Sequence, residues 1–230
     1  MNATPVCFQA PEGSSDQLDT ILAKYYEHYA GRDSFEERIR QATEANGTKP
    51  KQIEIVKTVE GGGFPAGIGP SALPAGSLPQ VWGQVANSNL IVIGTPVKAR
   101  TLPIANRTFA FTQYAVHVEK VISSGQTHVL AEDTIIVSRG GGELMVDNVL
   151  IKAVESAFSE FELNQSYVLM LRVIPGTTTY RALASGTYAV RNGQVFSAST
   201  FEKDITPKWD INRFLAEIDA ALGHKSPGGN

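Results

Sequence analysis

A run of three glycines beside an arginine is the sequence feature with the clearest chemical potential. Arg139 is followed by Gly140, Gly141 and Gly142, with strand-like segments on both sides. Successive backbone amides in such a run can form a concave nest that holds an anion next to the guanidinium. A tight or bulged connection between two strands requires the same residue types. The sequence leaves both interpretations open.

His117 and three glutamates are the remaining candidates for acid–base or metal chemistry. His117 and Glu119 lie two residues apart on a predicted strand, so they could form a pair of ligands, although a half-buried sheet histidine fits the same pattern. Glu155, Glu160 and Glu162 could do acid–base work if burial separated their pKa values, whereas carboxylates in a loop more often form a solvated face. The chain has no HExxH, GxSxG, SxxK or P-loop motif. We therefore assign no catalytic residue, no metal site and no cofactor.

Aromatic residues suggest an interaction surface instead. Tyr25, Tyr26 and Tyr29 lie on one short predicted helix, and Trp82 follows a stretch rich in glycine and proline. Aromatic side chains are enriched at the centres of protein interfaces, so these four residues are candidates for binding a partner. The alternative is that the tyrosines pack their helix onto the body of the same chain.

Composition restricts the class of protein. The chain has 230 residues, 42% of them hydrophobic, with 20 basic and 23 acidic residues and one cysteine, Cys7. The near-neutral balance argues against a nucleic-acid partner, and one cysteine excludes an intrachain disulfide or a multi-cysteine metal site. No run approaches the roughly 18 apolar residues of a transmembrane helix, and the N-terminal segment lacks the regions of a signal peptide. We expect a secreted or periplasmic mature chain without its leader, in preference to a cytoplasmic protein.

The elements that must position these residues begin with a helical arm over residues 1–60. Helical spacing predicts a first helix from Ser14 or Ser15 to Gly31, and Ser34-Phe35-Glu36-Glu37 forms a capping box for a second helix. A connector rich in glycine and proline follows at 61–85, and its prolines exclude a regular helix or a central strand over 61–80.

From residue 86 to residue 205 the period of the apolar residues changes to two, which predicts strands. The expected strands and hairpins cover residues 90–98, 109–122, 134–139, 143–154, 167–174, 180–184 and 187–197, after a short strand near 53–56. Asp147-Asn148 and Asn192-Gly193 suit tight hairpin turns. Strands without intervening helices favour an antiparallel barrel. A final helix over 206–223, capped by Thr206, is expected to pack on this barrel and to precede a tail at 224–230.

Part of the predicted barrel resembles a pattern found in bacterial secreted proteins of uncharacterised function. The residues that carry the resemblance are Asn89-Leu90-Ile91-Val92-Ile93-Gly94-Thr95, Tyr114-x-Val116-x-Val118-x-x-Val121, Ile135-x-Val137, Phe161-x-Leu163 and Tyr167-Val168-Leu169-Met170-Leu171. Over residues 86–200 the chain is also similar to the OB-type barrel of netrin-like domains and of tissue inhibitors of metalloproteinases. The resemblance implies a small barrel. It does not imply protease inhibition, because that family reaches a zinc through a disulfide-tied N-terminal cysteine, and Cys7 is neither N-terminal nor able to pair within the chain.

We therefore expect a mainly β (α+β) protein, a small antiparallel OB-like barrel with an N-terminal helical arm and a C-terminal helix. The expected function is a non-enzymatic binding or assembly module that interacts with a protein partner or with further copies of itself. The alternative is a hydrolytic enzyme with a site at the barrel mouth. That site would use His117, the segment Arg139–Glu143 and a carboxylate from residues 155–162.

Overall fold

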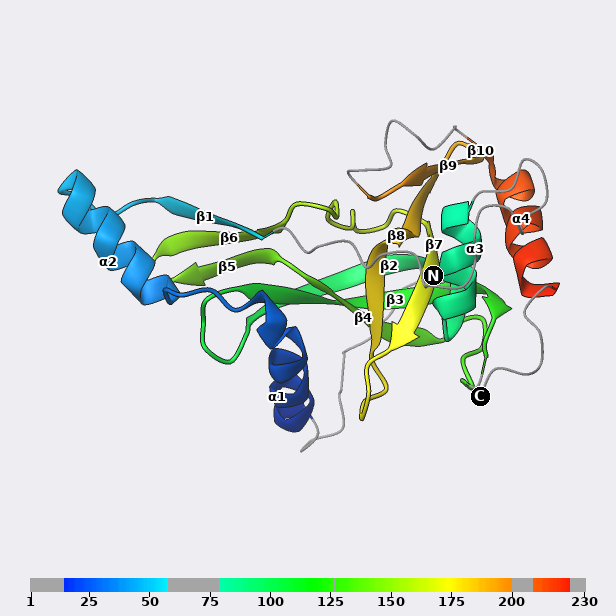
Figure 1. Ribbon diagram of the computed structural model, residues 1–230, viewed down its shortest axis with the longest axis horizontal. Coiled ribbons are helices and arrows are strands. Elements are labelled where there is room, and N and C mark those ends of the chain that lie inside the picture. Colours follow the sequence, from blue (N-terminus) through cyan, green and yellow to red (C-terminus); the bar gives the residue numbers. More distant parts are fainter. Residues whose placement is uncertain (1–14, 58–78, 126, 200–208, 224–230) are drawn as a thin grey trace, which may run out of the picture.

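The computed structural model describes residues 15–57, 79–125, 127–199 and 209–223 (Figure 1). The helices are α1 (Ser15–Tyr25), the 3-10 helix η1 (Tyr26–Tyr29), α2 (Phe35–Asn46), α3 (Pro79–Asn87) and α4 (Ile211–Gly223). The strands are β1 (Gln52–Lys57), β2 (Leu90–Pro103), β3 (Ala110–Ser123), β4 (Thr134–Gly140), β5 (Gly142–Val146), β6 (Val149–Glu155), β7 (Tyr167–Val173), β8 (Tyr180–Arg191), β9 (Gln194–Ser197) and β10 (Trp209–Asp210). The described part is mainly β, as the sequence predicts.

Five strands close into a barrel. β2 pairs with β3, β3 with β4, β4 with β8, β8 with β7, and β7 returns to β2. The β4–β8 pairing is parallel, and the other four pairings are antiparallel. A small closed Greek-key barrel of five strands is the OB-like architecture, so the predicted fold class is confirmed.

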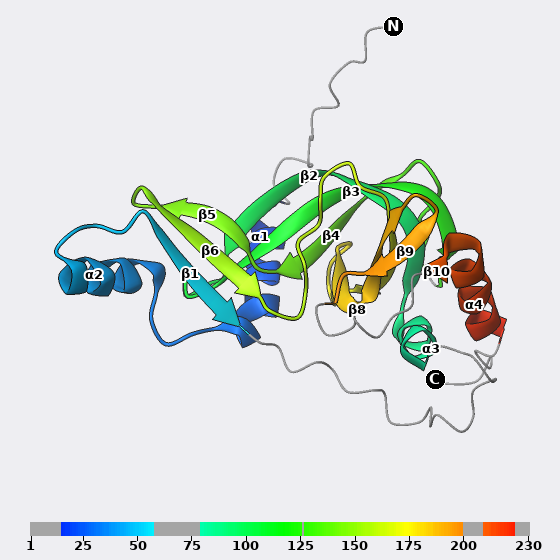
Figure 2. The same cartoon turned by 90° about the horizontal axis from the view of Figure 1, so that it is seen from above.

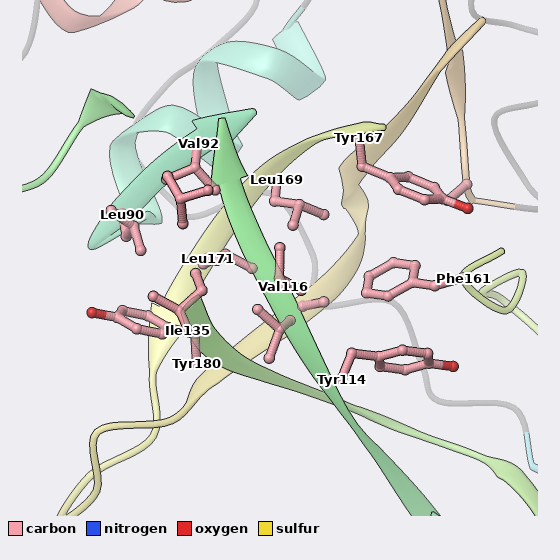
Figure 3. Packing of buried hydrophobic residues seen from close by; sticks show 14 of the residues in the cluster. Leu90, Val92, Tyr114, Val116, Ile135, Phe161, Tyr167, Leu169, Leu171 and Tyr180 are labelled. Atoms are coloured by element: carbon pink, nitrogen blue, oxygen red, sulfur yellow. The ribbon is translucent and has the colours of Figure 1, made fainter. Parts of the chain in front are cut away.

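The interior of the barrel is filled by side chains. Alternate residues of its strands point inward, and their leucine, valine and tyrosine side chains meet there (Figure 3). Phe161, from the segment between β6 and β7, lies over one end of this core. Its ring centroid is 4.8 Å from that of Tyr114 and 5.0 Å from that of Tyr167. The barrel interior is therefore a packed core.

Helices α3 and α4 cover one outer face of the barrel (Figures 1 and 2). Trp82 of α3, Phe214 of α4 and Tyr188 of β8 are buried together, with ring centroids of the last two 4.6 Å apart. The predicted connector at 61–85 is wrong in its last part, since α3 occupies residues 79–87. Pro79 begins this helix, and proline is favoured in the first helical turn because its missing N–H would have no partner there. Residues 61–78 lie outside the described residues.

The C-terminal helix lies on the barrel, but it begins later than predicted. Trp209 and Asp210 form β10, which pairs with β9, so the helix starts at Ile211. The carboxylate of Asp210 accepts hydrogen bonds from the amides of Asn212 (2.9 Å) and Arg213 (3.4 Å). Asp210 therefore caps the helix. The predicted cap, Thr206, lies outside the described residues, as does Cys7.

A second, smaller unit of structure lies on the side of the barrel away from α3 and α4 (Figure 2). β1, β6 and β5 form a three-stranded sheet, with β1 parallel and β5 antiparallel to β6 (Figure 2). One face of this sheet shares a core with α1, η1, α2 and the extended end of the β2–β3 hairpin. Both predicted hairpin turns are confirmed, because the positive φ angles fall at Asp147, Asn148, Asn192 and Gly193. The hydroxyl of Ser34 caps α2 by accepting from the Glu37 amide at 3.3 Å.

Candidate functional site

The tyrosines of the N-terminal arm lie against strands of the same chain. Tyr26 and Tyr29 are 0% and 2% exposed. Their rings stack on Phe111 of β3 and on Phe109, the residue just before β3, with centroids 5.0 Å apart in each pair. Tyr25 is half-buried. The structure therefore supports the packing alternative for Tyr26 and Tyr29, which have no surface to offer a partner in this arrangement.

Polar groups hold the arm to β3, β4 and β8. These are the second, third and fifth strands of the barrel in chain order. The Tyr26 hydroxyl is 2.9 Å from the Ser138 hydroxyl of β4, and burial raises its pKa well above the ordinary value. Arg181 of β8 donates to the Tyr25 hydroxyl at 3.4 Å, and Gln113 of β3 donates to Asp19 at 3.2 Å. The second and third strands of an OB barrel are those that bind oligonucleotides and oligosaccharides. Here the arm occupies that surface.

Arg139 lies inside the protein. It is 2% exposed, its Nη2 donates to the Phe158 carbonyl at 2.8 Å, and its guanidinium lies 4.5 Å from the centre of the Phe158 ring. Its Nε and Nη1 atoms are buried and have no hydrogen-bond partner among the described residues. Arg139 therefore attaches β4 to the segment between β6 and β7, and it does not face solvent where an anion could reach it.

The glycine run is a close crossing of strands. The Gly141 amide, at a residue with φ +89°, donates to the Ala110 carbonyl at 2.8 Å. A Cβ placed on Gly142 would lie 2.1 Å from the Thr112 hydroxyl oxygen, and one on Gly140 would lie 2.7 Å from Cζ of Tyr29. These contacts leave no room for a side chain where the chain passes from β4 to β5. The structure supports a strand connection here and not an open anion nest.

Glu155 lies beside this crossing and is separated from the other two glutamates. Its side chain is 8% exposed, and its Oε2 would be 2.9 Å from a Cβ on Gly140. Burial raises the pKa of Glu155, while the positive charge of Arg139 acts in the opposite direction. The Tyr29 hydroxyl lies beside Glu155, and its contact with the carboxylate acts on that pKa in the same direction as the charge of Arg139. Glu160 and Glu162 are exposed and belong to a different surface.

His117 is remote from Arg139. The register pairs His117 with Thr134 and Thr112 with Arg139, so five residues separate the two sites along β3, about 17 Å. His117 is 38% exposed, and its Nε2 is 3.6 Å from a carboxylate oxygen of Glu132. The structure does not bring together the residues that the hydrolase hypothesis requires.

Glu119 and Trp82, the remaining ligand and aromatic candidates, form hydrogen bonds within the protein. Glu119 accepts hydrogen bonds from the hydroxyls of Thr95 and Ser166, the second at 3.3 Å. Trp82 is 6% exposed, and its indole N–H donates to Glu217 of α4. Trp82 therefore joins α3 to α4 and offers little surface to a partner.

Within the described ranges, no three His, Cys, Asp or Glu side chains form a metal-binding group. No helix of these ranges has the length and hydrophobicity to cross a membrane.

A pocket of about 330 Å³ lies beside the end of the barrel that Phe161 covers. Its walls are the segment 159–162 and the β8–β9 hairpin, and apolar groups of Tyr167, Ala189, Val195 and Ala198 line it. Glu160, Glu162 and Arg191 line it with charged groups. Arg191 and Glu162 form an ion pair at 2.6 Å. The sequence shows the two glutamates, but no local signal marks Arg191 as their neighbour, because it is 29 residues from Glu162.

The second surface of interest is the outer face of the three-stranded sheet, which we call the open face. The register places on it Gln52, Glu54, Val56, Glu143, Met145, Leu150, Lys152 and Val154. Met145 and Val56 are 63% and 53% exposed, and Leu150 and Val154 between them are partly exposed. Strand 149–155 carries apolar residues at both odd and even positions, which indicates that its outer face is apolar as well as its inner face. The sites expected from the sequence do not include this face.

Comparison with known proteins does not place the chain in a family. A scan against protein-family models finds no match, and a search of curated proteins finds none. The two candidate functional surfaces of the protein are the pocket and the open face.

Proposed function

We propose that the protein is a binding module that recognises a partner protein through the open face. The observation that carries this proposal is the exposure of Met145 and Val56 on one face of β1–β6–β5, with Leu150 and Val154 between them. The register forms two apolar pairs, Met145 with Leu150 and Val56 with Val154, on either side of Lys152 and its neighbours Glu54 and Glu143. Exposed apolar groups beside polar residues are typical of protein interaction surfaces. A secreted or periplasmic location is part of the same proposal.

The other surfaces of the barrel support this choice. The arm covers the second and third strands, and α3 and α4 cover another outer face. The interior is filled by side chains. Five large apolar side chains are strongly exposed among the described residues. Two of them lie on this sheet, Val56 of β1 and Met145 of β5. Apolar contact with a partner would remove these side chains from water at about 25 cal/mol per Å² of buried area.

Charge favours a different protein over a second copy as the partner. Three charged residues share the open face, Glu54, Glu143 and Lys152, and Lys152 pairs with Glu143 at 3.4 Å. The face therefore has one excess negative charge. Two copies meeting through it would bring like charges together, whereas a partner with apolar side chains beside lysine or arginine would complement it.

A peptide-display selection tests this proposal with a defined probe. A random dodecapeptide library is selected on the wild-type protein, and binders are then screened against Met145→Glu and Val56→Glu. Leu130→Glu is the matched control, because Leu130 is 68% exposed and lies between β3 and β4, away from the open face. We expect peptides with apolar and basic residues that lose binding to both open-face variants and keep binding to the control.

Two outcomes would overturn the proposal. One is a selection in which no peptide distinguishes the open-face variants from the Leu130→Glu control. The other is a concentration-dependent dimer in analytical ultracentrifugation that Met145→Glu abolishes, since this would assign the open face to a second copy. Circular dichroism of each variant establishes that it is folded.

A further inference from the structure

The pocket beside the barrel is preformed by contacts within the chain. The amide of Ser159 donates to the Ala198 carbonyl at 2.9 Å, and Phe158 forms a β-bridge with Ser199. The Tyr167 hydroxyl accepts the amide of Glu162 at 2.8 Å, which joins the wall to the floor. Arg139 holds the same segment from behind through the Phe158 carbonyl. A site whose walls are already held in place loses less entropy when a ligand binds.

Three charged residues line the pocket, two glutamates and one arginine, so one carboxylate is left without a cationic partner in it. Arg191 is neutralised by Glu162, with N and O atoms 2.6 Å apart and side chains 48% and 65% exposed. Glu160 lines the same pocket and forms no ion pair among the described residues. The three groups therefore sum to one negative charge, at the rim of a cavity with an apolar floor.

We propose that this pocket binds an organic monocation, a primary ammonium or guanidinium group on a short aliphatic chain. Glu160 would receive the cationic head, and Ala189, Val195 and Ala198 would contact the aliphatic part. This inference concerns another part of the molecule and does not depend on the open face.

The size and chemistry of the pocket exclude other ligand classes. A volume of about 330 Å³ is at the lower end of small-molecule sites, which suits a molecule of a few carbon atoms and not a large cofactor. A metal ion is disfavoured because Glu162 is already paired with Arg191, and no three His, Cys, Asp or Glu side chains of the described residues form a metal-binding group. An anion would have to compete with Glu162 for Arg191 while facing Glu160.

The test is a ligand titration followed by protein NMR. The probes are n-pentylamine and n-butylguanidinium, with pentanol as the neutral control and pentanoate as the anionic control. We expect both cations to shift the amide signals of Ala189 and Phe196, which line the pocket, and the two controls to have no saturable effect. Glu160→Gln should weaken cation binding at least about tenfold, because it removes the charge of the group that accepts the charge-assisted hydrogen bond.

Glu44→Gln is the matched control, because Glu44 is a glutamate of α2 that is 62% exposed and lies in the other part of the molecule. It should leave cation binding unchanged. A further titration with Nα-acetyl-lysine methylamide distinguishes two sources of the same chemistry. Binding as tight as that of pentylamine would support a lysine side chain of a protein, and exclusion of the blocked amino acid would support a free amine.

Three results would overturn the inference. The first is an absence of saturable binding by either cation, and the second is tighter binding of pentanoate than of pentylamine. The third is equal weakening in Glu160→Gln and Glu44→Gln, which would show a general charge effect. None of these results bears on the peptide selection at the open face, so the two proposals fail separately.

Discussion

Replacing Gly140 with alanine is expected to destabilise the protein by overpacking against Tyr29 and Glu155. A Cβ at this position would lie 2.7 Å from Cζ and 2.9 Å from Cε1 of Tyr29, and 2.9 Å from Oε2 of Glu155. Gly140 is not among the residues with positive φ, so its backbone would accept alanine without strain. The whole effect therefore comes from overpacking against Tyr29 of the arm and Glu155 of β6.

The expected magnitude follows from the rigidity of these neighbours. Tyr29 is 2% exposed and stacks on Phe109, so its ring cannot move aside without disturbing the arm core. Overpacking of this kind costs about 1–3 kcal/mol. For a chain of 230 residues, a loss of about 2 kcal/mol lowers the melting temperature by about 4–8 °C.

Thermal unfolding followed by circular dichroism measures this change, with Gly31→Ala as the matched control. A Cβ on Gly31 would have its nearest neighbours at 3.6 Å, and its φ is not positive, so this variant should be as stable as the wild type or slightly more stable. Tyr29→Leu combined with Gly140→Ala should recover part of the loss, with a coupling of at least about 0.5 kcal/mol. Equal melting temperatures for Gly140→Ala and the wild type would refute the assignment of the glycine run to close packing.

Three further predictions concern the arm, the buried carboxylate and the C-terminal helix. Tyr26→Phe should lower the free energy of unfolding by about 0.5–1.5 kcal/mol in urea, because it removes the hydroxyl contact with Ser138 and keeps the stacking on Phe111. Ser138→Ala in the Tyr26→Phe background should lower it little further. A second loss of the same size would contradict this. Burial raises the pKa of Glu155, so the folded state holds that proton more tightly, and the contribution of Glu155 to the free energy of unfolding should fall as pH rises above 4.5. Glu155→Gln should therefore gain stability relative to the wild type between pH 4.5 and pH 7.5, and an unchanged difference across that range would contradict the assignment. Asp210→Ala should lower stability by about 1 kcal/mol in thermal unfolding through loss of the cap on α4, with Asp210→Asn close to the wild type; equal losses in both would contradict the capping role.

The local elements of this fold are largely readable from the sequence. The two-residue period of the strand segments and the turns at Asp147-Asn148 and Asn192-Gly193 depend on contacts within a few residues, and the structure confirms them. The glycine and proline content of residues 61–85 predicts a connector and gives no indication of helix α3. Val81, Trp82 and Val85 show helical spacing there, and each is buried. The predicted start of α4 is wrong because Trp209 and Asp210 pair with β9 and do not join the helix.

The candidate sites were less predictable, because each depends on residues far apart in the chain. The sequence shows Glu160 and Glu162 as loop carboxylates, but only the folded β8–β9 hairpin places Arg191 beside Glu162. It shows Arg139 beside three glycines, and both an exposed nest and a buried crossing satisfy that pattern. Burial decided between them, and burial depends on what the arm and the segment after β6 cover.

By itself, the sequence determined the strands, the tight turns, the helical arm and the mainly β class, since these follow from local periodicity and from backbone angles available to particular residues. Only the tertiary structure decided that the tyrosines face the barrel, that His117 and Arg139 are far apart, and that the open face of β1–β6–β5 is exposed. The physical reason is the closure of the barrel. The β4–β8 and β7–β8 pairings join segments whose register no local pattern specifies, and that register determines which side chains meet.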